Sequence, residues 1–156
     1  MPAGKRKNLN FYLFLFILFI FIFSVDRYTK LYIINHFFPL QSIPIIKNIF
    51  HLTFICNTGG FFGVFKNNNF IFIIVSFLAI ILIIRDLRDA STDNNFKVAL
   101  TLIIAGAMGN LIDRLLWGYV IDFLDFRIWP VFNIADTSIS CGVILIIYRM
   151  FIKNRS

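Results

Sequence analysis

The sequence has 156 residues, of which 59% are hydrophobic and 18% aromatic, and its mean hydropathy is +0.82. A water-soluble domain of this size is about half apolar, so this composition indicates a protein whose solvent is lipid. The net charge of +7 raises the question of nucleic-acid binding. The basic residues flank apolar runs and form no stripe on a soluble face, which excludes nucleic acid as the expected partner.

Four apolar runs follow one another along the chain, at 11–25, 70–84, 98–108 and 139–152. A helix needs about 20 residues to cross a bilayer core, so each span must include polar residues from its flanks. We therefore predict an all-α membrane protein that forms a single domain over 1–156. Its four transmembrane helices are expected at about 9–28, 68–86, 98–117 and 134–152.

The first run follows a basic segment, as a cleavable signal peptide does. No small-residue cleavage site comes after it, because the next residues are Ser24, Val25, Asp26 and Arg27. We interpret the run as a retained membrane helix.

The segment 31–66 is the longest part of the chain outside the expected spans. It contains β-branched and aromatic stretches at 43–46 and 49–55, together with Pro39 and Pro44. Such stretches favour short strands. We predict a small extracytoplasmic β-like and loop subdomain between helices 1 and 2.

The basic residues also predict the orientation in the membrane. Nine of the fifteen fall before the first run, between the second and third, or after the fourth: Lys5, Arg6, Lys7, Arg85, Arg88, Lys97, Arg149, Lys153 and Arg155. Positive charge is enriched on the cytoplasmic side of membrane proteins. We expect both termini in the cytoplasm, and the polar ends of the spans on the outer side.

Several kinds of chemistry lack the necessary residues. His36 and His51 have no ligand spacing for zinc, and Cys56 and Cys141 form no CxxC pair, so we expect structural roles for all four and no metal or cofactor. The serines include no GxSxG motif. All eight acidic residues are Asp, so any carboxylate chemistry must come from a short set of positions.

Polar residues gather at the outer ends of the expected spans, where charged groups persist mainly if they face a partner or a polar cavity. Asp26 and Lys30 are four apart and can pair on a helix. Asp113 and Arg114 are expected to neutralise neighbouring groups. Asp125 is interpreted as a solvated loop acid that pairs with Arg127.

Asp122 and Asp136 are the candidates for a catalytic pair. Asp122 follows the apolar residues 119–121 without an adjacent cation, and Asp136 lies where the last helix begins. Asp136 can alternatively act as an N-cap, a role for which Asn133, Thr137 and Ser138 compete. Two close carboxylates share a proton, so one can activate water while the other polarises a carbonyl. The helix dipole favours Asp136 as the ionised member.

Five blocks resemble, in order, those of lipoprotein signal peptidases: VDRYTK at 25–30, NTGGFFG at 57–63, AGAMGNLIDR at 105–114, GYVIDF at 118–123 and FNIADTSI at 132–139. The resemblance extends from about residue 20 to the C-terminus. It implies an aspartyl endopeptidase of the bacterial cytoplasmic (inner) membrane. The implied reaction is hydrolysis of the bond before the diacylglyceryl-modified cysteine of a prolipoprotein.

By this resemblance Asp122 and Asp136 are catalytic. Substrate-binding or site-supporting roles are implied for Asp26, Lys30, Asn57, Gly59, Asn110, Asp113, Arg114 and Asn133. The implied partners are prolipoprotein substrates, membrane lipids and globomycin-type inhibitors. Gly60 and Phe61 replace the Ala-Ala pair that is frequent in the family, so Phe61 is expected to reshape the substrate groove.

Two other functions compete with a peptidase, namely a small membrane carrier and an assembly factor. A carrier needs polar groups near the middle of the membrane and inverted repeats, and the sequence has no detectable repeat. An assembly factor would keep its function after Asp→Asn changes.

Overall fold

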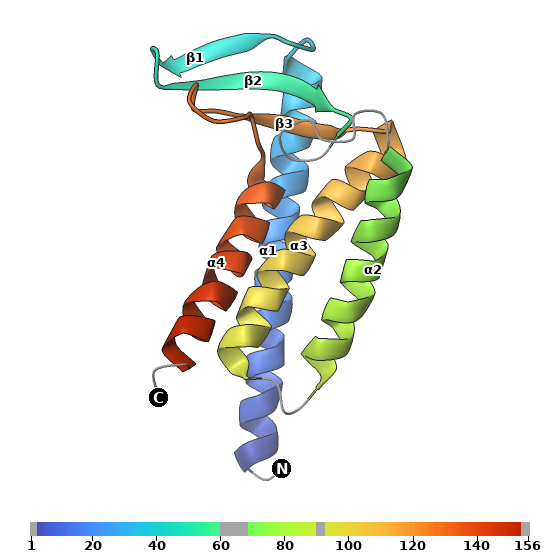
Figure 1. The fold of residues 1–156 in the computed structure, drawn as a ribbon, viewed down its shortest axis with the longest axis vertical. Coiled ribbons are helices and arrows are strands. Elements are labelled where there is room, and N and C mark those ends of the chain that lie inside the picture. The colour runs from blue at the N-terminus through green and yellow to red at the C-terminus, as the bar shows by residue number, and fades with distance from the viewer. Residues whose placement is uncertain (1–2, 60–68, 90–92, 154–156) are drawn as a thin grey trace.

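The computed structural model describes residues 3–59, 69–89 and 93–153. Four helices lie alongside one another and a three-stranded sheet lies across one end (Figure 1). The elements, in order, are α1 (Ala3–His36), β1 (Ser42–Ile46), β2 (Phe50–Asn57), α2 (Asn69–Arg88), α3 (Asn94–Trp117), β3 (Val120–Asp125) and α4 (Ile134–Lys153). The start of α1 and the end of α4 both lie at the end of the bundle opposite the sheet.

The four helices confirm the predicted fold class. Within the described residues, each is long and apolar enough to cross a membrane, over Asn8–His36, Asn69–Arg88, Asn94–Trp117 and Ile134–Phe151. The chain is therefore a multi-pass membrane protein.

The first helix differs from the prediction, because α1 continues past Tyr28 to His36. The start of the segment 31–66 is consequently helical. This extension is stabilised by burial of Ile33 and of Phe37, which follows the helix, against Phe54 and Phe123 of the sheet. The extra turns of α1 thus support the sheet from below rather than ending at the membrane surface.

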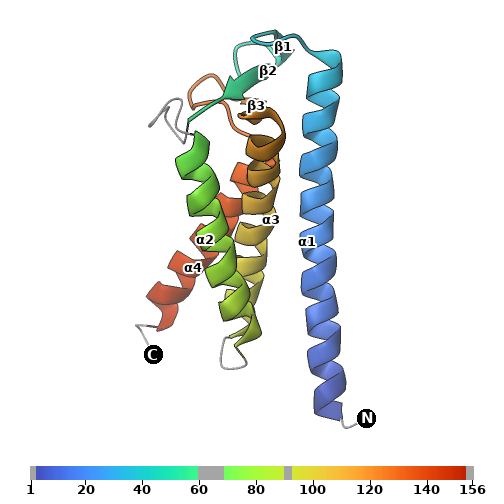
Figure 2. The ribbon, with the colours of Figure 1, turned by 90° about the vertical axis from the view of Figure 1, so that its right-hand side faces the viewer.

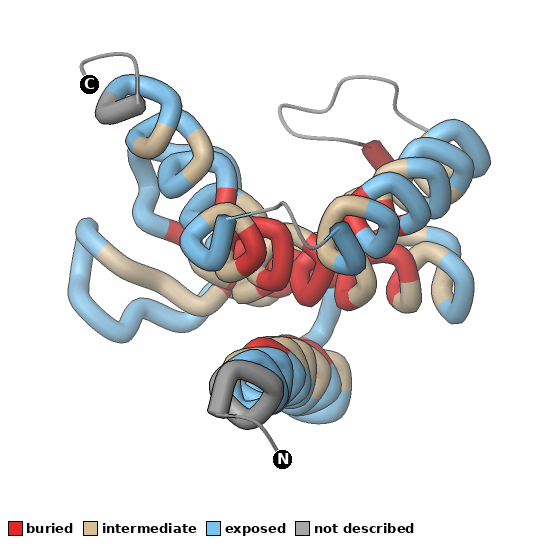
Figure 3. The backbone as a smooth tube through the Cα atoms, turned by 90° about the horizontal axis from the view of Figure 1, so that it is seen from below, coloured by how far each residue is buried: buried red, intermediate tan, exposed pale blue. Residues whose placement is uncertain are grey.

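Helix α3 is the central element and contacts α1, α2 and α4 (Figures 2 and 3). Its contact with α4 depends on small residues. A Cβ atom at Gly106 would lie 2.3 Å from the carbonyl oxygen of Ala135, and one at Gly142 would lie 2.7 Å from that of Ala99. Close backbone approach of this kind is how membrane helices gain contact area without a hydrophobic driving force.

The antiparallel sheet has the order β1-β2-β3. Strands β1 and β2 confirm the β-like subdomain, but β3, which lies between the third and fourth expected spans, was not predicted. Gly118 ends α3 with a positive φ of 78°, which reverses the chain. The next residues pair with β2, with Asn57 opposite Val120 and Ile55 opposite Asp122. The pairing brings two distant polar blocks together.

Candidate active site

Four charged side chains meet where α1 and α3 approach the sheet. The Nζ atom of Lys30 lies 3.1 Å from Oδ2 of Asp26 and 2.8 Å from Oδ2 of Asp113, and Arg27 pairs with Asp113. Asp26, Lys30 and Asp113 are each at most 1% exposed. The predicted Asp26–Lys30 pair is confirmed, whereas Arg27 was not expected in the cluster. Two cations and two carboxylates compensate one another.

This cluster also holds the backbone of the two segments that carry the candidate pair. Asp113 accepts a hydrogen bond from the backbone N–H of Ile121, at 3.2 Å, immediately before Asp122. Asp26 accepts one from the backbone N–H of Ala135, at 2.9 Å, immediately before Asp136. The buried ion cluster therefore fixes β3 and the start of α4 relative to α1 and α3.

Two asparagines connect the cluster to the candidate pair. Lys30 donates to Oδ1 of Asn110, and Nδ2 of Asn110 donates to Asp136, both at 2.8 Å. Asn133, which is fully buried, donates to Asp122 at 2.7 Å and to Oδ1 of Asn110 at 3.2 Å. Asp122 and Asp136 are thereby linked through Asn133 and Asn110.

The N-cap of α4 is Asn133 and not Asp136. The side-chain Oδ1 of Asn133 accepts a hydrogen bond from the backbone N–H of Asp136 at 2.8 Å. Asp136 lies in the first turn, so its carboxylate is not used for capping. It remains available to Asn110 and to a substrate.

Asp122 lies on β3 and is 2% exposed. Its second carboxylate oxygen accepts a hydrogen bond from Nδ2 of Asn57 at 2.8 Å, and Oδ1 of Asn57 in turn accepts one from the backbone N–H of Gly59. Burial and, secondly, the nearby charge of Asp136 raise the pKa of Asp122 to about 7. A carboxyl group in this state can hold a proton near neutral pH.

Arg114 joins three elements near the same site. Its guanidinium lies 3.4 Å from the carbonyl oxygens of Asn110 and Gly59, and 5.0 Å from the centre of the Phe72 ring on α2. The other predicted site residues, Asn57 and Gly59, lie at the end of β2 and just beyond it. Phe61 lies outside the described residues.

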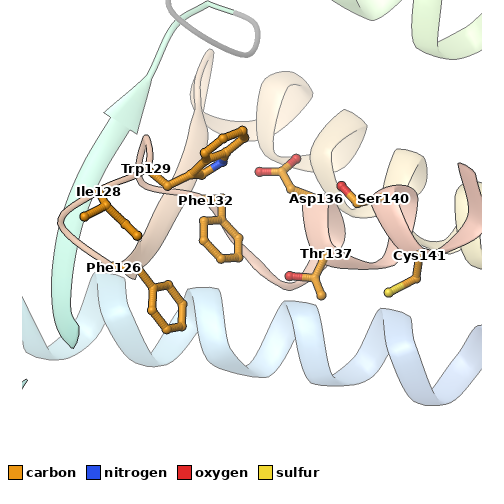
Figure 4. A pocket seen from close by; sticks show the side chains of 8 residues that line it. All are labelled: Phe126, Ile128, Trp129, Phe132, Asp136, Thr137, Ser140 and Cys141. Carbon is orange, nitrogen blue, oxygen red and sulfur yellow. The ribbon is translucent and has the colours of Figure 1, made fainter. Parts of the chain in front are cut away.

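An open apolar cavity of about 450 Å³ adjoins Asp136 (Figure 4). Aromatic and aliphatic side chains of the β3–α4 connection lie on one side, and Asp136 with neighbouring α4 side chains on the other. The lining residues are Phe126, Ile128, Trp129, Phe132, Asp136, Thr137, Ser140 and Cys141. Sequence reasoning missed this cavity, although apolar residues within 126–132, outside every expected span, were an available signal.

Asp125 is buried, at 4% exposure, and is not the solvated acid that was expected. It pairs with Arg127 at 2.9 Å, as predicted, and also accepts a hydrogen bond from Thr53 on β2 at 2.8 Å. Burial alone would raise its pKa, but the hydrogen bonds from Thr53 and Arg127 outweigh it and hold the pKa of Asp125 below its ordinary value. Its partners separate it from the candidate pair.

Comparison with known proteins places these residues in a family. The family model described as "Signal peptidase (SPase) II" matches residues 18–152. A protein of Clostridioides difficile named "Lipoprotein signal peptidase" is 43% identical over 135 residues, covering 85% of this chain and 91% of that one. One from Moorella thermoacetica with the same name is 42% identical over 130 residues, covering 83% and 87%.

A solved structure described as a bacterial membrane enzyme is similar to this fold, with a TM-score of 0.85 and 32% identity, covering 90% of this chain and 88% of that one. A second structure with that description has a TM-score of 0.79 and 33% identity, with coverage of 87% and 91%. The family match includes the sheet and the residues of the buried site, and the chain belongs to the signal peptidase II family of peptidases.

Proposed function

We propose that this chain is an aspartyl endopeptidase that removes the signal peptide of bacterial prolipoproteins. It hydrolyses the bond before the diacylglyceryl-modified cysteine, and Asp122 and Asp136 are its catalytic residues. The observation that carries the proposal is the link between the two carboxylates through Asn133 and Asn110, beside an open apolar cavity. The names of the curated relatives support the substrate class.

The reaction needs one ionised and one protonated carboxyl group. Asp136 takes a proton from a water molecule, and the resulting hydroxide attacks the carbonyl carbon of the scissile bond. Asp122, whose raised pKa allows it to hold a proton, donates that proton to the carbonyl oxygen. The proton on Asp136 then passes to the leaving amine as the C–N bond breaks, and Asp122 recovers its proton from the collapsing diol. No covalent intermediate forms.

The remaining site residues hold this pair or its substrate. Lys30 orients Asn110, while Asp26 and Asp113 fix the backbone of α4 and β3. Asn57 and Asn133 orient Asp122. Arg114 and Gly59 are assigned to the substrate backbone or headgroup, because they lie beside the pair without forming hydrogen bonds to it among the described contacts.

The proposed location is the bacterial cytoplasmic (inner) membrane, with the sheet on the outer side and both termini in the cytoplasm. Arg85, Arg88, Lys97 and Arg149 lie on the helix ends away from the sheet, in the arrangement expected of a cytoplasmic face. A lipid-anchored substrate would reach the site laterally, from the surrounding membrane lipids. Globomycin-type cyclic peptides are expected to inhibit by occupying the cavity beside Asp136.

The test is cleavage of a diacylglyceryl-modified prolipoprotein by the purified chain in detergent. Asp122→Asn and Asp136→Asn should each lower kcat by about 10²–10⁴-fold, the usual contribution of a catalytic acid or base. Asp125→Asn is the matched control, because it alters a buried aspartate on the same strand that is held by Thr53 and Arg127 instead.

Thermal unfolding would establish that all three variants are folded. Cleavage at the wild-type rate by Asp122→Asn or by Asp136→Asn would refute the catalytic pair. An equal loss of cleavage in Asp125→Asn would show that the losses come from a disturbed fold and not from the removal of a catalytic group.

A further inference from the structure

Helices α1 and α2 stand apart from one another in Figures 2 and 3, and at the end of the bundle away from the sheet side chains of both helices line the same cavities. Two apolar cavities of about 190 and 440 Å³ occupy this region. They share Tyr12 and Leu87 and so form one groove, which lies between α1 and α2 with α3 as its floor. The smaller is also lined by Leu15, Phe16, Phe19, Thr101 and Ile104, and the larger by Ile84 and Arg88.

A buried cation lies beside this groove. Lys97 on α3 is 4% exposed, and its Nζ atom donates to the hydroxyl of Tyr12 at 2.9 Å and lies 5.1 Å from the ring centre. Among the residues that the structure describes, no carboxylate forms an ion pair with Lys97 or with Arg88. Nearby Arg149, by contrast, pairs with Asp93 at 2.6 Å.

The polar groups at the mouth of the groove are suited to an anion. The Tyr12 hydroxyl oxygen accepts a hydrogen bond from Lys97, so the hydroxyl hydrogen can be donated to a ligand. Arg88 is exposed and lines the larger cavity, whereas Asp86 on α2 and Asp89 just after the helix line neither cavity. The groove is thus positive at its mouth and apolar within.

We propose that this groove binds an anionic phospholipid. Its phosphate would lie against Arg88 and the Tyr12 hydroxyl, and an acyl chain would extend along Leu15, Phe19 and Ile104. Charge complementarity favours an anionic headgroup, as in other basic pockets between membrane helices. The apolar lining lies within the spans, so the ligand is a lipid and not a soluble phosphate. The site is separate from the peptidase site, at the other end of the bundle.

Native mass spectrometry of the full chain in detergent would test this, with titration of phosphatidylglycerol and, separately, phosphatidylcholine of the same acyl chains. The wild-type chain should bind phosphatidylglycerol more tightly. Arg88→Gln should weaken phosphatidylglycerol binding about fivefold, the usual effect of one basic residue on an anionic lipid, and should weaken phosphatidylcholine binding less, because the choline cation offsets the charge of its phosphate.

Arg85→Gln is the matched control, because it removes one exposed charge from the same helix without lining the groove. It should change neither affinity by more than about twofold, well below the effect of a direct contact. Leu87→Trp, which narrows both cavities, should weaken the binding of both lipids. Equal binding of the two lipids by the wild type, or equal effects of the Arg85 and Arg88 variants, would overturn the proposal.

Discussion

The two ends of the helix bundle each bury a lysine, but they compensate its charge differently. Lys30, at the sheet end, contacts two carboxylates and the Asn110 side chain. Lys97, at the other end, contacts only the hydroxyl and ring of Tyr12 among the described residues. Lys97 lies in the first turns of α3, close to where its ammonium can reach the membrane surface. Of the two buried lysines, only the one beside the candidate site has its charge neutralised by carboxylates among the described residues.

The difference has a functional meaning. At the sheet end the buried polar groups are connected in series, so that Lys30 orients Asn110 and Asn110 orients Asp136. Such a network is rigid when every member is hydrogen-bonded. Removal of one member leaves its partners unsatisfied and lowers the stability of the whole network. The isolated Lys97–Tyr12 contact has no comparable role, and four experiments can sharpen or break this distinction.

The largest effect is expected from replacing the two lysines with methionine. Lys30→Met leaves Asp26 and Asp113 buried with only Arg27 as a cation, and should lower the free energy of unfolding by about 3–5 kcal/mol. Lys97→Met removes a cation that faces no carboxylate, and should lower it by about 1 kcal/mol or less. Denaturant unfolding in bicelles measures both. Equal losses would mean that the two ends do not differ.

Asn133→Ala should lower kcat for prolipoprotein cleavage by about 10²-fold, because small displacements of catalytic groups have effects of this size. Its amide orients Asp122 and its side-chain oxygen caps the helix that carries Asp136. Ser138→Ala is the control. Ser138 lies on α4 like Asp136, and this change removes one part-buried hydrogen bond to the carbonyl oxygen of Leu102 on α3. A similar loss in both variants would assign Asn133 to general stability.

The raised pKa of Asp122 predicts a dependence on pH. The folded state keeps this proton up to about pH 7, whereas the unfolded state loses it near 3.8. The unfolded state therefore binds fewer protons between these values, and this group's contribution to stability falls as pH rises, by about 1.4 kcal/mol per unit. Cleavage should also decline above pH 7, as Asp122 loses the proton that we propose it donates to the substrate.

Unfolding midpoints measured from pH 4 to 8 would test this, with Asp122→Asn as the variant in which the contribution of this group is absent. A wild-type curve that matches the variant curve would contradict the assignment of the proton to Asp122.

The smallest effect is expected outside the network. Thr53→Val removes the hydrogen bond from Thr53 to Asp125 and should lower the free energy of unfolding by about 1 kcal/mol. Cleavage should stay close to the wild-type rate, since Thr53 and Asp125 contact neither Asp122 nor Asp136 among the described interactions. A large loss of cleavage would extend the catalytic network along the sheet.

The four spans and the gathering of polar residues at one end could be predicted from the sequence, because apolar runs are long and the acidic residues are few. The extent of α1 could not, since it depends on Ile33 and Phe37 packing against Phe54 and Phe123 far along the chain. Strand β3 is likewise specified by a partner 65 residues away, as in the bond between Asn57 and Asp122. Local patterns carry no record of such pairings.

The details of the site could not be predicted where neighbouring residues were chemically suited to the same role. Asn133 and Asp136 are both good caps, and only the tertiary structure determines which one is used. Arg27 is one residue from Asp26 and three from Lys30, so its spacing alone does not reveal that it reaches Asp113 on α3. The burial of Asp125 results from Thr53 on the neighbouring strand.

The long-range contacts of Asp26 and Asn57 also set the moment during synthesis at which the site can form. The hydrogen bond from the backbone N–H of Ala135 to Asp26 joins residues 109 positions apart, and α4 follows all the other described elements in the sequence. Because a protein leaves the ribosome N-terminus first, neither Asp136 nor its Asn133 cap exists until α4 has been translated. A nascent chain in which α4 has not yet been translated lacks Asp136, so the proposed pair of carboxylates cannot form before α4 has been made.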